Sequence, residues 1–132
     1  MEIERIEDWV GSDVVDLSGE KVGKLEDFYY APGSDDPIAA AVKYGTLGKT
    51  LSIIPLDGAS VTRSYLRVSH AKDSLKHAPD VQPGMDLASS TVLDAATHYG
   101  ATLPNGELES GARRKQAAED RAAASSANAS SS

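Results

Sequence analysis

The 132-residue sequence predicts a mainly β fold: a small SH3-like antiparallel β-barrel, followed by short helices and a disordered C-terminal tail. Five short strand-like runs fall between residues 9 and 68, and turn residues rather than crossover helices join them, which indicates an antiparallel sheet. A sheet of this size protects its edges best by closing into a barrel. We therefore assign residues 1–80 to the barrel, 81–100 to a helical extension and 101–132 to a low-complexity tail.

A tight turn joins the first two predicted strands. The β-branched pair at 14–15 leads into a turn at which Gly19 is free to adopt a positive φ angle. The second run covers 22–30, and we expect a bulge at Gly23, where the alternation of apolar and polar residues breaks. Two prolines and a glycine within 31–37 then predict an exposed loop.

The remaining strands follow the same pattern of short runs and turns. Residues 38–44 alternate at period two and give the clearest strand signal in the chain. Residues 45–48 predict a hairpin connection, and 49–54 predict a fourth strand that ends at a proline. The Asp57-Gly58 turn leads into the fifth run, 59–68.

The character of the sequence changes after residue 68. Two short helices are expected, over 69–77 and 90–99, each opened by a serine that can act as N-cap. From residue 101 the chain carries few large apolar groups, and 122–132 contains only Ala, Ser and Asn. Such a segment cannot bury enough surface to offset the entropy of ordering, so we expect it to be disordered.

The composition excludes several classes of protein. The chain contains no cysteine, which rules out disulfides and thiolate metal sites. Lys and Arg number 13 against 20 Asp and Glu, and a net charge of −7 disfavours direct binding to a nucleic-acid backbone. No segment approaches the roughly 18 apolar residues of a membrane span, and the acidic N-terminus lacks a signal-peptide pattern. We expect a soluble, cytoplasmic protein without membrane insertion.

Two hydrophobic residues, a turn with glycine, and a Val-Gly-Lys strand leading to an acidic residue form the most specific pattern in the chain. The residues that carry it are Val10-Gly11, Val14-Val15-Asp16-Leu17-Ser18-Gly19-Glu20-Lys21-Val22-Gly23-Lys24-Leu25-Glu26-Asp27, Ile54-Pro55-Leu56 and Ala78-Pro79. With them, residues 8–81 resemble the PRC-barrel family, named after the cytoplasmic part of the photosynthetic reaction centre H subunit. In that comparison Gly11, Gly19 and Gly23 are structural glycines.

The resemblance implies a compact barrel without a family-wide catalytic site and without a cofactor. Relatives look like adaptors: one class sits on a membrane-embedded electron-transfer complex, and another forms half of a ribosome-maturation factor that contacts a ribosomal protein. Many stand-alone members tend to self-associate. The sequence shows neither the transmembrane helix of the first class nor the preceding barrel of the second, so neither specific role is transferred.

One group of residues has the spacing of a metal site. His70, Asp73 and His77 would lie on one face of the first short helix, and two imidazoles with a carboxylate can bind a divalent ion. A solvated helix edge with an Asp–His pair explains the same spacing, and we favour it. No arrangement of serine, histidine and acid indicates catalysis, so no catalytic residue and no metal are expected.

Aromatic side chains are the candidates for an interface. We single out the following five: Trp9, Phe28, Tyr29, Tyr44 and Tyr65. Neighbouring residues on a strand point to opposite faces of the sheet, so Phe28 and Tyr29 cannot share one core. Either the second helix covers the second face, with Val92, Leu93 and Tyr99, or that face is free to bind a partner.

The sequence therefore predicts a non-enzymatic adaptor that binds another protein, or a second copy of itself as a homodimer. Peripheral association with a membrane complex is compatible with this prediction. Two alternatives stay open: an accessory protein of the ribosome or of RNA processing, which the net charge disfavours, and a stress-related or envelope-proximal scaffold whose tail carries the partner motif.

Overall fold

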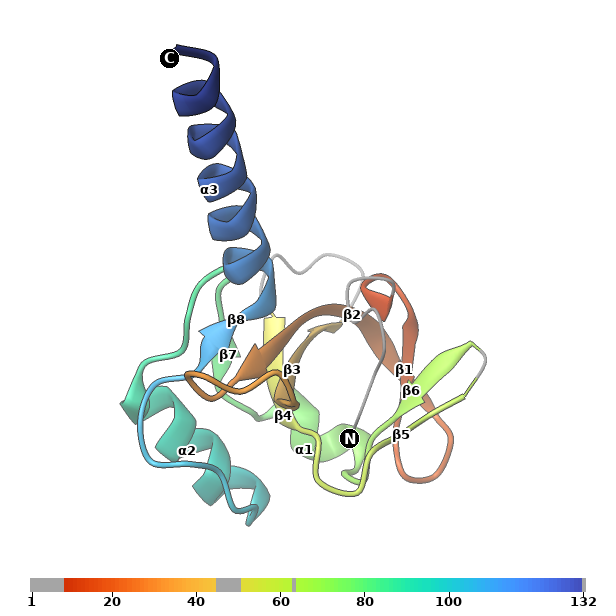
Figure 1. Cartoon of the computed structure of the whole chain (residues 1–132). Coiled ribbons are helices and arrows are strands. Elements are labelled where there is room, and N and C mark those ends of the chain that lie inside the picture. Colours follow the sequence, from red (N-terminus) through yellow and green to blue (C-terminus); the bar gives the residue numbers. More distant parts are fainter. Residues whose placement is uncertain (1–8, 45–50, 63, 132) are drawn as a thin grey trace.

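A computed structural model describes residues 9–44, 51–62 and 64–131 (Figure 1). Its elements, in chain order, are β1 (Asp13–Val15), β2 (Lys21–Tyr30), β3 (Pro37–Tyr44), β4 (Leu51–Pro55), β5 (Ser60–Val61), β6 (Tyr65–Arg67), α1 (Lys72–Lys76), β7 (Asp80–Val81), α2 (Ser89–Tyr99), β8 (Glu109–Ser110) and α3 (Gly111–Ser131). The predicted hairpin at 45–48 and the start of the fourth predicted strand lie outside the described residues.

The strands form one curled sheet in the order β5-β6-β1-β2-β3-β4-β7, with β8 added beside the end of β2 (Figure 1). The mainly β prediction is confirmed, but two details differ. β1 and β6 pair in parallel, and among the described strands no pairing joins β5 to β7, so the sheet is not closed into a barrel. The two end strands have only two residues each, and such short edges offer few hydrogen bonds with which to close a ring.

The sheet is buried on both faces, which gives the domain two cores. The core inside the curl contains Val14, Leu25, Phe28 and Leu66, all at most 1% exposed. The core on the outer face is built around Tyr29, and α2 covers it. Its main members are Tyr29, Ala39, Ala41, Ile53, Val92, Ala95 and Leu108. Phe28 and Tyr29 therefore do point to opposite faces, and both are buried.

The second helix covers the outer face, but only one of the three side chains expected to do so contributes. Val92 of α2 is 1% exposed and packs in the outer core, whereas Leu93 is 62% exposed and does not contribute. Tyr99 packs against the inner core, and its hydroxyl donates a hydrogen bond to the Ile53 carbonyl at 2.7 Å. α2 ends where predicted, because Gly100 adopts a left-handed conformation with φ of 64°.

Two of the three structural glycines illustrate different constraints. Gly19 has φ of 87° in the turn between β1 and β2, as predicted. Gly23 lies next to an irregularity in the β1–β2 pairing, and a Cβ atom there would stand 2.0 Å from the Lys43 carbonyl oxygen of β3. Only glycine fits this position, since the neighbouring strand's backbone occupies the space of a side chain.

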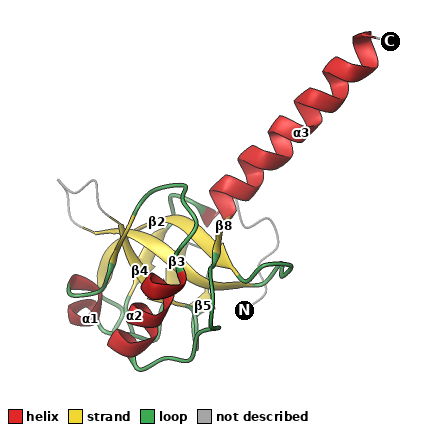
Figure 2. Cartoon of the chain, turned by 90° about the vertical axis from the view of Figure 1, so that its left-hand side faces the viewer, coloured by secondary structure: helices red, strands yellow, loops and turns green. Residues whose placement is uncertain are grey.

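The expected disorder from residue 101 onwards is wrong for residues 108–112, which are bound to the body. Leu108 is fully buried, residues 109 and 110 pair with β2, and a helix follows. That helix, α3, leaves the body and points away from it in both views (Figures 1 and 2). Among the helices of the described ranges, none combines the length and apolar character that crossing a bilayer requires.

Two tyrosine hydroxyls provide a test of the outer core. The Tyr29 hydroxyl is buried and has no hydrogen-bond partner among the described residues, whereas that of Tyr99 is bonded. We expect Tyr29→Phe to raise the free energy of unfolding by about 1 kcal/mol, because it removes an unsatisfied buried group. Tyr99→Phe is the matched control and is expected to lower it by about 1 kcal/mol. Urea denaturation monitored by circular dichroism measures both, and a loss of stability in Tyr29→Phe would contradict this packing.

Candidate interaction site at the root of α3

The five aromatic candidates do not gather into one exposed patch. Phe28 and Tyr29 are 1% and 0% exposed, so neither is a free surface residue. Trp9 and Tyr44 are half-buried and pack against the inner core, and Tyr65 is half-buried in β6. A role of Trp9, Tyr44 or Tyr65 in partner binding stays a prediction.

The three residues with metal-like spacing have separate surroundings. The His70 imidazole lies 3.0 Å from the carboxylate of Asp57, a residue that the spacing did not indicate. Asp73 pairs with Lys76 at 3.8 Å, and His77 is the C-cap of α1. Among the described residues there is no group of three or more His, Cys, Asp or Glu that would hold a metal ion.

The structure points instead to the junction between β2 and the first turn of α3, which we call the α3 root (residues 109–115 and the β2 residues that they contact). Its centre is Asp27, a carboxylate only 3% exposed. It accepts hydrogen bonds from the backbone N–H groups of Phe28 and Ala112, at 2.8 and 3.0 Å, and from the Ser110 hydroxyl. The Ala112 N–H belongs to the first turn of α3, where backbone donors have no partner within the helix.

Asp27 therefore caps a helix that lies more than eighty residues further along the chain. The Ser110 oxygen accepts a hydrogen bond from the Arg113 N–H at 3.2 Å, which satisfies another donor of the same turn. Burial raises the pKa of the Asp27 carboxyl group, and the hydrogen bonds from Ser110 and Ala112 offset this only in part.

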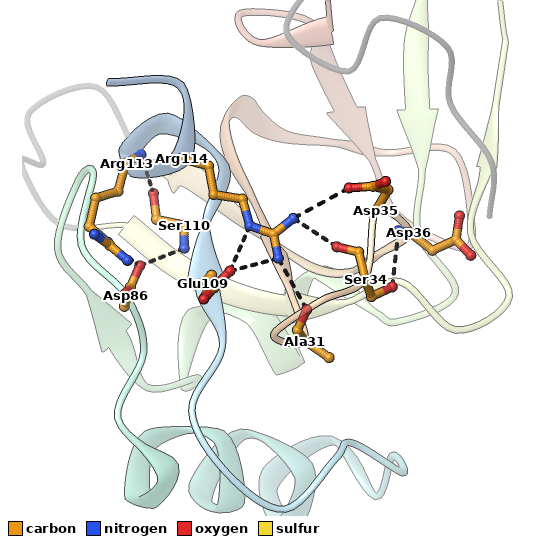
Figure 3. A network of polar contacts seen from close by, with 9 residues as sticks. All are labelled: Ala31, Ser34, Asp35, Asp36, Asp86, Glu109, Ser110, Arg113 and Arg114. Atoms are coloured by element: carbon orange, nitrogen blue, oxygen red, sulfur yellow. Dashed lines mark hydrogen bonds and ion pairs between the residues drawn. The ribbon is translucent and has the colours of Figure 1, made fainter. Parts of the chain in front are cut away.

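Arg114 attaches α3 to the loop between β2 and β3 (Figure 3). Its guanidinium group donates to Glu109 at 2.8 Å, to the Ser34 carbonyl at 2.7 Å and to the Ala31 carbonyl at 3.1 Å. It also lies over the Tyr30 ring, 4.4 Å from the centroid. A planar cation with several donors suits such a convergence of carbonyl groups, a carboxylate and a ring.

Arg113 attaches the same turn to a third segment. Its side chain contacts Asp86 at 2.8 Å, and Asp86 also accepts the Ser110 N–H at 2.9 Å (Figure 3). The guanidinium group of Arg113 holds the pKa of Asp86 below its usual value. The first turn of α3 is thus bonded to β2, to the 31–36 loop and to the segment before α2. These contacts set the direction in which the helix leaves the body.

An open cavity of about 380 Å³ lies beside this root. Its walls combine apolar groups of the body with the first turn of the helix. The lining is Val10, Glu26, Asp27, Phe28, Tyr30, Gly111, Ala112 and Lys115. Val10 is 47% exposed, so the lining includes an apolar side chain that solvent reaches. The arrangement offers apolar contact surface with a few charged groups, as sites for protein or small-molecule ligands do.

Sequence reasoning missed the α3 root because its partners are far apart in the chain. One signal was present: Asp27 stands inside a strand whose neighbours 25 and 28–30 are apolar, and aspartate is depleted in strands. A buried carboxylate of this kind needs donors, and the donors come from the segment that was expected to be disordered.

A curled, mostly antiparallel sheet that is buried on both faces, with helices packed against it, defines a small, mainly β domain. The family model of the PRC-barrel domain matches residues 1–75, which is more than half of the chain. The chain therefore belongs to the PRC-barrel family. The comparison with curated proteins finds no match. The family match ends before β7, so Asp27, Phe28 and Tyr30 of the α3 root lie within it, whereas Ser110 to Lys115 lie beyond it.

The role of Asp27 as a cap gives the next prediction. Asp27→Ala removes the acceptor of the Ala112 and Phe28 amides and of the Ser110 hydroxyl, and we expect a loss of about 2 kcal/mol in the free energy of unfolding. Asp27→Asn keeps one oxygen acceptor and is expected to lose less. Chemical denaturation followed by circular dichroism and Trp9 fluorescence compares the two, and equal stability of Asp27→Ala and wild type would contradict the cap.

A comparison of wild type with Asp27→Asn tests the pKa of Asp27. Because burial raises this pKa above 3.8, the folded protein binds the proton more tightly than the unfolded chain. The corresponding stability is fully present below the unfolded pKa and is lost as the pH rises through the folded one. The stability of wild type relative to Asp27→Asn should therefore fall from about pH 4 towards neutrality. A rising difference would show that the hydrogen bonds outweigh desolvation.

Proposed function

We propose that this chain is a non-enzymatic protein-binding module of the PRC-barrel type, and that its partner docks at the α3 root. The observation that carries the proposal is the open apolar cavity formed jointly by the sheet and the first turn of α3. Protein interfaces commonly centre on such a concave apolar site with a polar rim. Val10 in its lining supplies exposed apolar surface that binding would remove from water.

The form of α3 supports the same proposal. Residues 118–124 of the helix are exposed, and the segment presents alanines and charged residues without an apolar stripe. A helix that is polar on all sides and packs only at its root receives little stabilisation from the rest of its own chain. Contact with a partner would supply the missing stabilisation, since helical stability in proteins comes mostly from tertiary packing.

The polar groups of the root favour binding over catalysis. Ser110 donates its hydroxyl to the Asp27 carboxylate and accepts the amide of Arg113, so both of its hydrogen-bonding roles serve the helix. Its side chain is fully buried. A nucleophile needs access to its substrate, and the burial of this serine does not provide it.

Site-specific photo-crosslinking tests the proposal. A photoreactive phenylalanine analogue at Val10, 47% exposed, is compared with the same analogue at Leu17, which is 49% exposed in the β1–β2 turn. We expect several-fold more protein adduct from Val10, both in cells and with the purified chain at roughly 100 µM. An adduct of twice the chain mass identifies a second copy as the partner. Equal yields at the two positions would contradict docking at the α3 root.

A further inference from the structure

We infer that the cavity at the α3 root takes a basic side chain, lysine or arginine, carried by an apolar segment of the partner. The inference rests on the proposed function and adds the chemistry of what is bound. Three features lead to it: the apolar groups of the lining, the two carboxylates among its three charged residues, and the pairing of the neighbouring arginines with other carboxylates.

The walls suit the stem of a long basic side chain. Val10, Phe28 and Tyr30 are apolar or aromatic, and Gly111 and Ala112 add backbone without bulk. Lysine and arginine bury their methylene stems along such surface while their charged ends reach polar groups. A cavity of about 380 Å³ is larger than one such side chain, so apolar neighbours from the same segment would share it.

Acidic residues outnumber basic ones in the lining. Two of the three charged lining residues are Glu26 and Asp27, and Asp27 is 3% exposed. None of the ion pairs found in the described part of the chain involves Asp27. A buried carboxylate without a cation carries an electrostatic cost that a bound cation would reduce.

The hydrogen-bond donors at Asp27 among the described residues are neutral groups. Its Oδ1 atom accepts the Phe28 and Ala112 amides, and its Oδ2 atom accepts the Ser110 hydroxyl. A cation bound here would favour the ionised form and so oppose the rise in pKa that burial causes.

The cations already near the cavity leave this preference in place. Arg114 is paired with Glu109 and Arg113 with Asp86, so each is balanced by a carboxylate. Lys115 is the third charged lining residue, and within the described ranges it forms no ion pair. It is exposed and competes with a basic ligand, which makes its removal a useful test.

The test uses the full chain and three capped peptides of sequence Gly-Leu-X-Leu-Gly, in which X is Lys, Gln or Glu. Titrations are followed by the amide resonances of ¹⁵N-labelled protein at low salt. We expect shifts at Glu26, Phe28, Gly111 and Ala112, at least fivefold tighter binding of the Lys peptide than of the Gln peptide, and no saturable binding of the Glu peptide. The preference for Lys should shrink at high salt.

Variants assign the preference to this cavity. Glu26→Gln is expected to lower the affinity for the Lys peptide at least threefold. Glu107→Gln, an exposed control with the same change of net charge, should leave that affinity unchanged. Lys115→Gln should raise the affinity for the Lys peptide at least twofold, and Asp27→Asn should lower it while the helical circular dichroism of the chain is retained.

Two results would overturn the inference. Equal affinity for the Lys and Gln peptides, with shifts at the lining, would refute the basic side chain and leave docking at the α3 root intact. Absence of shifts at the lining with every peptide would also refute it, and the Val10 cross-link would then decide separately whether the docking site itself fails.

Discussion

The structure depends on one buried carboxylate. Asp27 of β2 accepts hydrogen bonds from the Ala112 amide and the Ser110 hydroxyl at the first turn of α3, and without it the buried Ser110 hydroxyl would lose its acceptor. Because this bond joins residues more than eighty positions apart, it makes the C-terminal segment part of the domain. Arg114 and Arg113 then fix the helix against two further segments, and the cavity exists only because α3 is held there.

The sequence was informative where local rules decide the outcome. The turn at Gly19, the end of α2 at Gly100 and the opposite directions of Phe28 and Tyr29 all follow from backbone geometry or from the period of a strand. These features could be predicted because each depends on neighbours in the chain. Closure of the barrel could not, since it depends on how far the short end strands β5 and β7 extend.

The C-terminal segment shows why the remaining features were missed. Its composition suggested disorder, yet a single leucine, Leu108, is fully buried, and hydrogen bonds rather than apolar area hold the rest. The composition of a segment gives only its own apolar content. It does not reveal that the buried carboxylate of Asp27, far away in the sequence, needs hydrogen-bond donors from that segment. The family match stops at residue 75, so the site combines strand β2, which lies within the match, with a C-terminal segment beyond it. The proposed docking site therefore depends on residues of the C-terminal segment that the family match does not cover.

The orientation of α3 relative to the sheet is the most direct measure of this account. Residual dipolar couplings of amides in β2, β3 and residues 112–117 report whether these elements share one alignment. If the Asp27 and Arg114 contacts fix the helix, a single alignment tensor fits all three groups in the wild-type chain. A separate, strongly averaged tensor for 112–117 would show that the root is not held, and the cavity would then lose one of its walls.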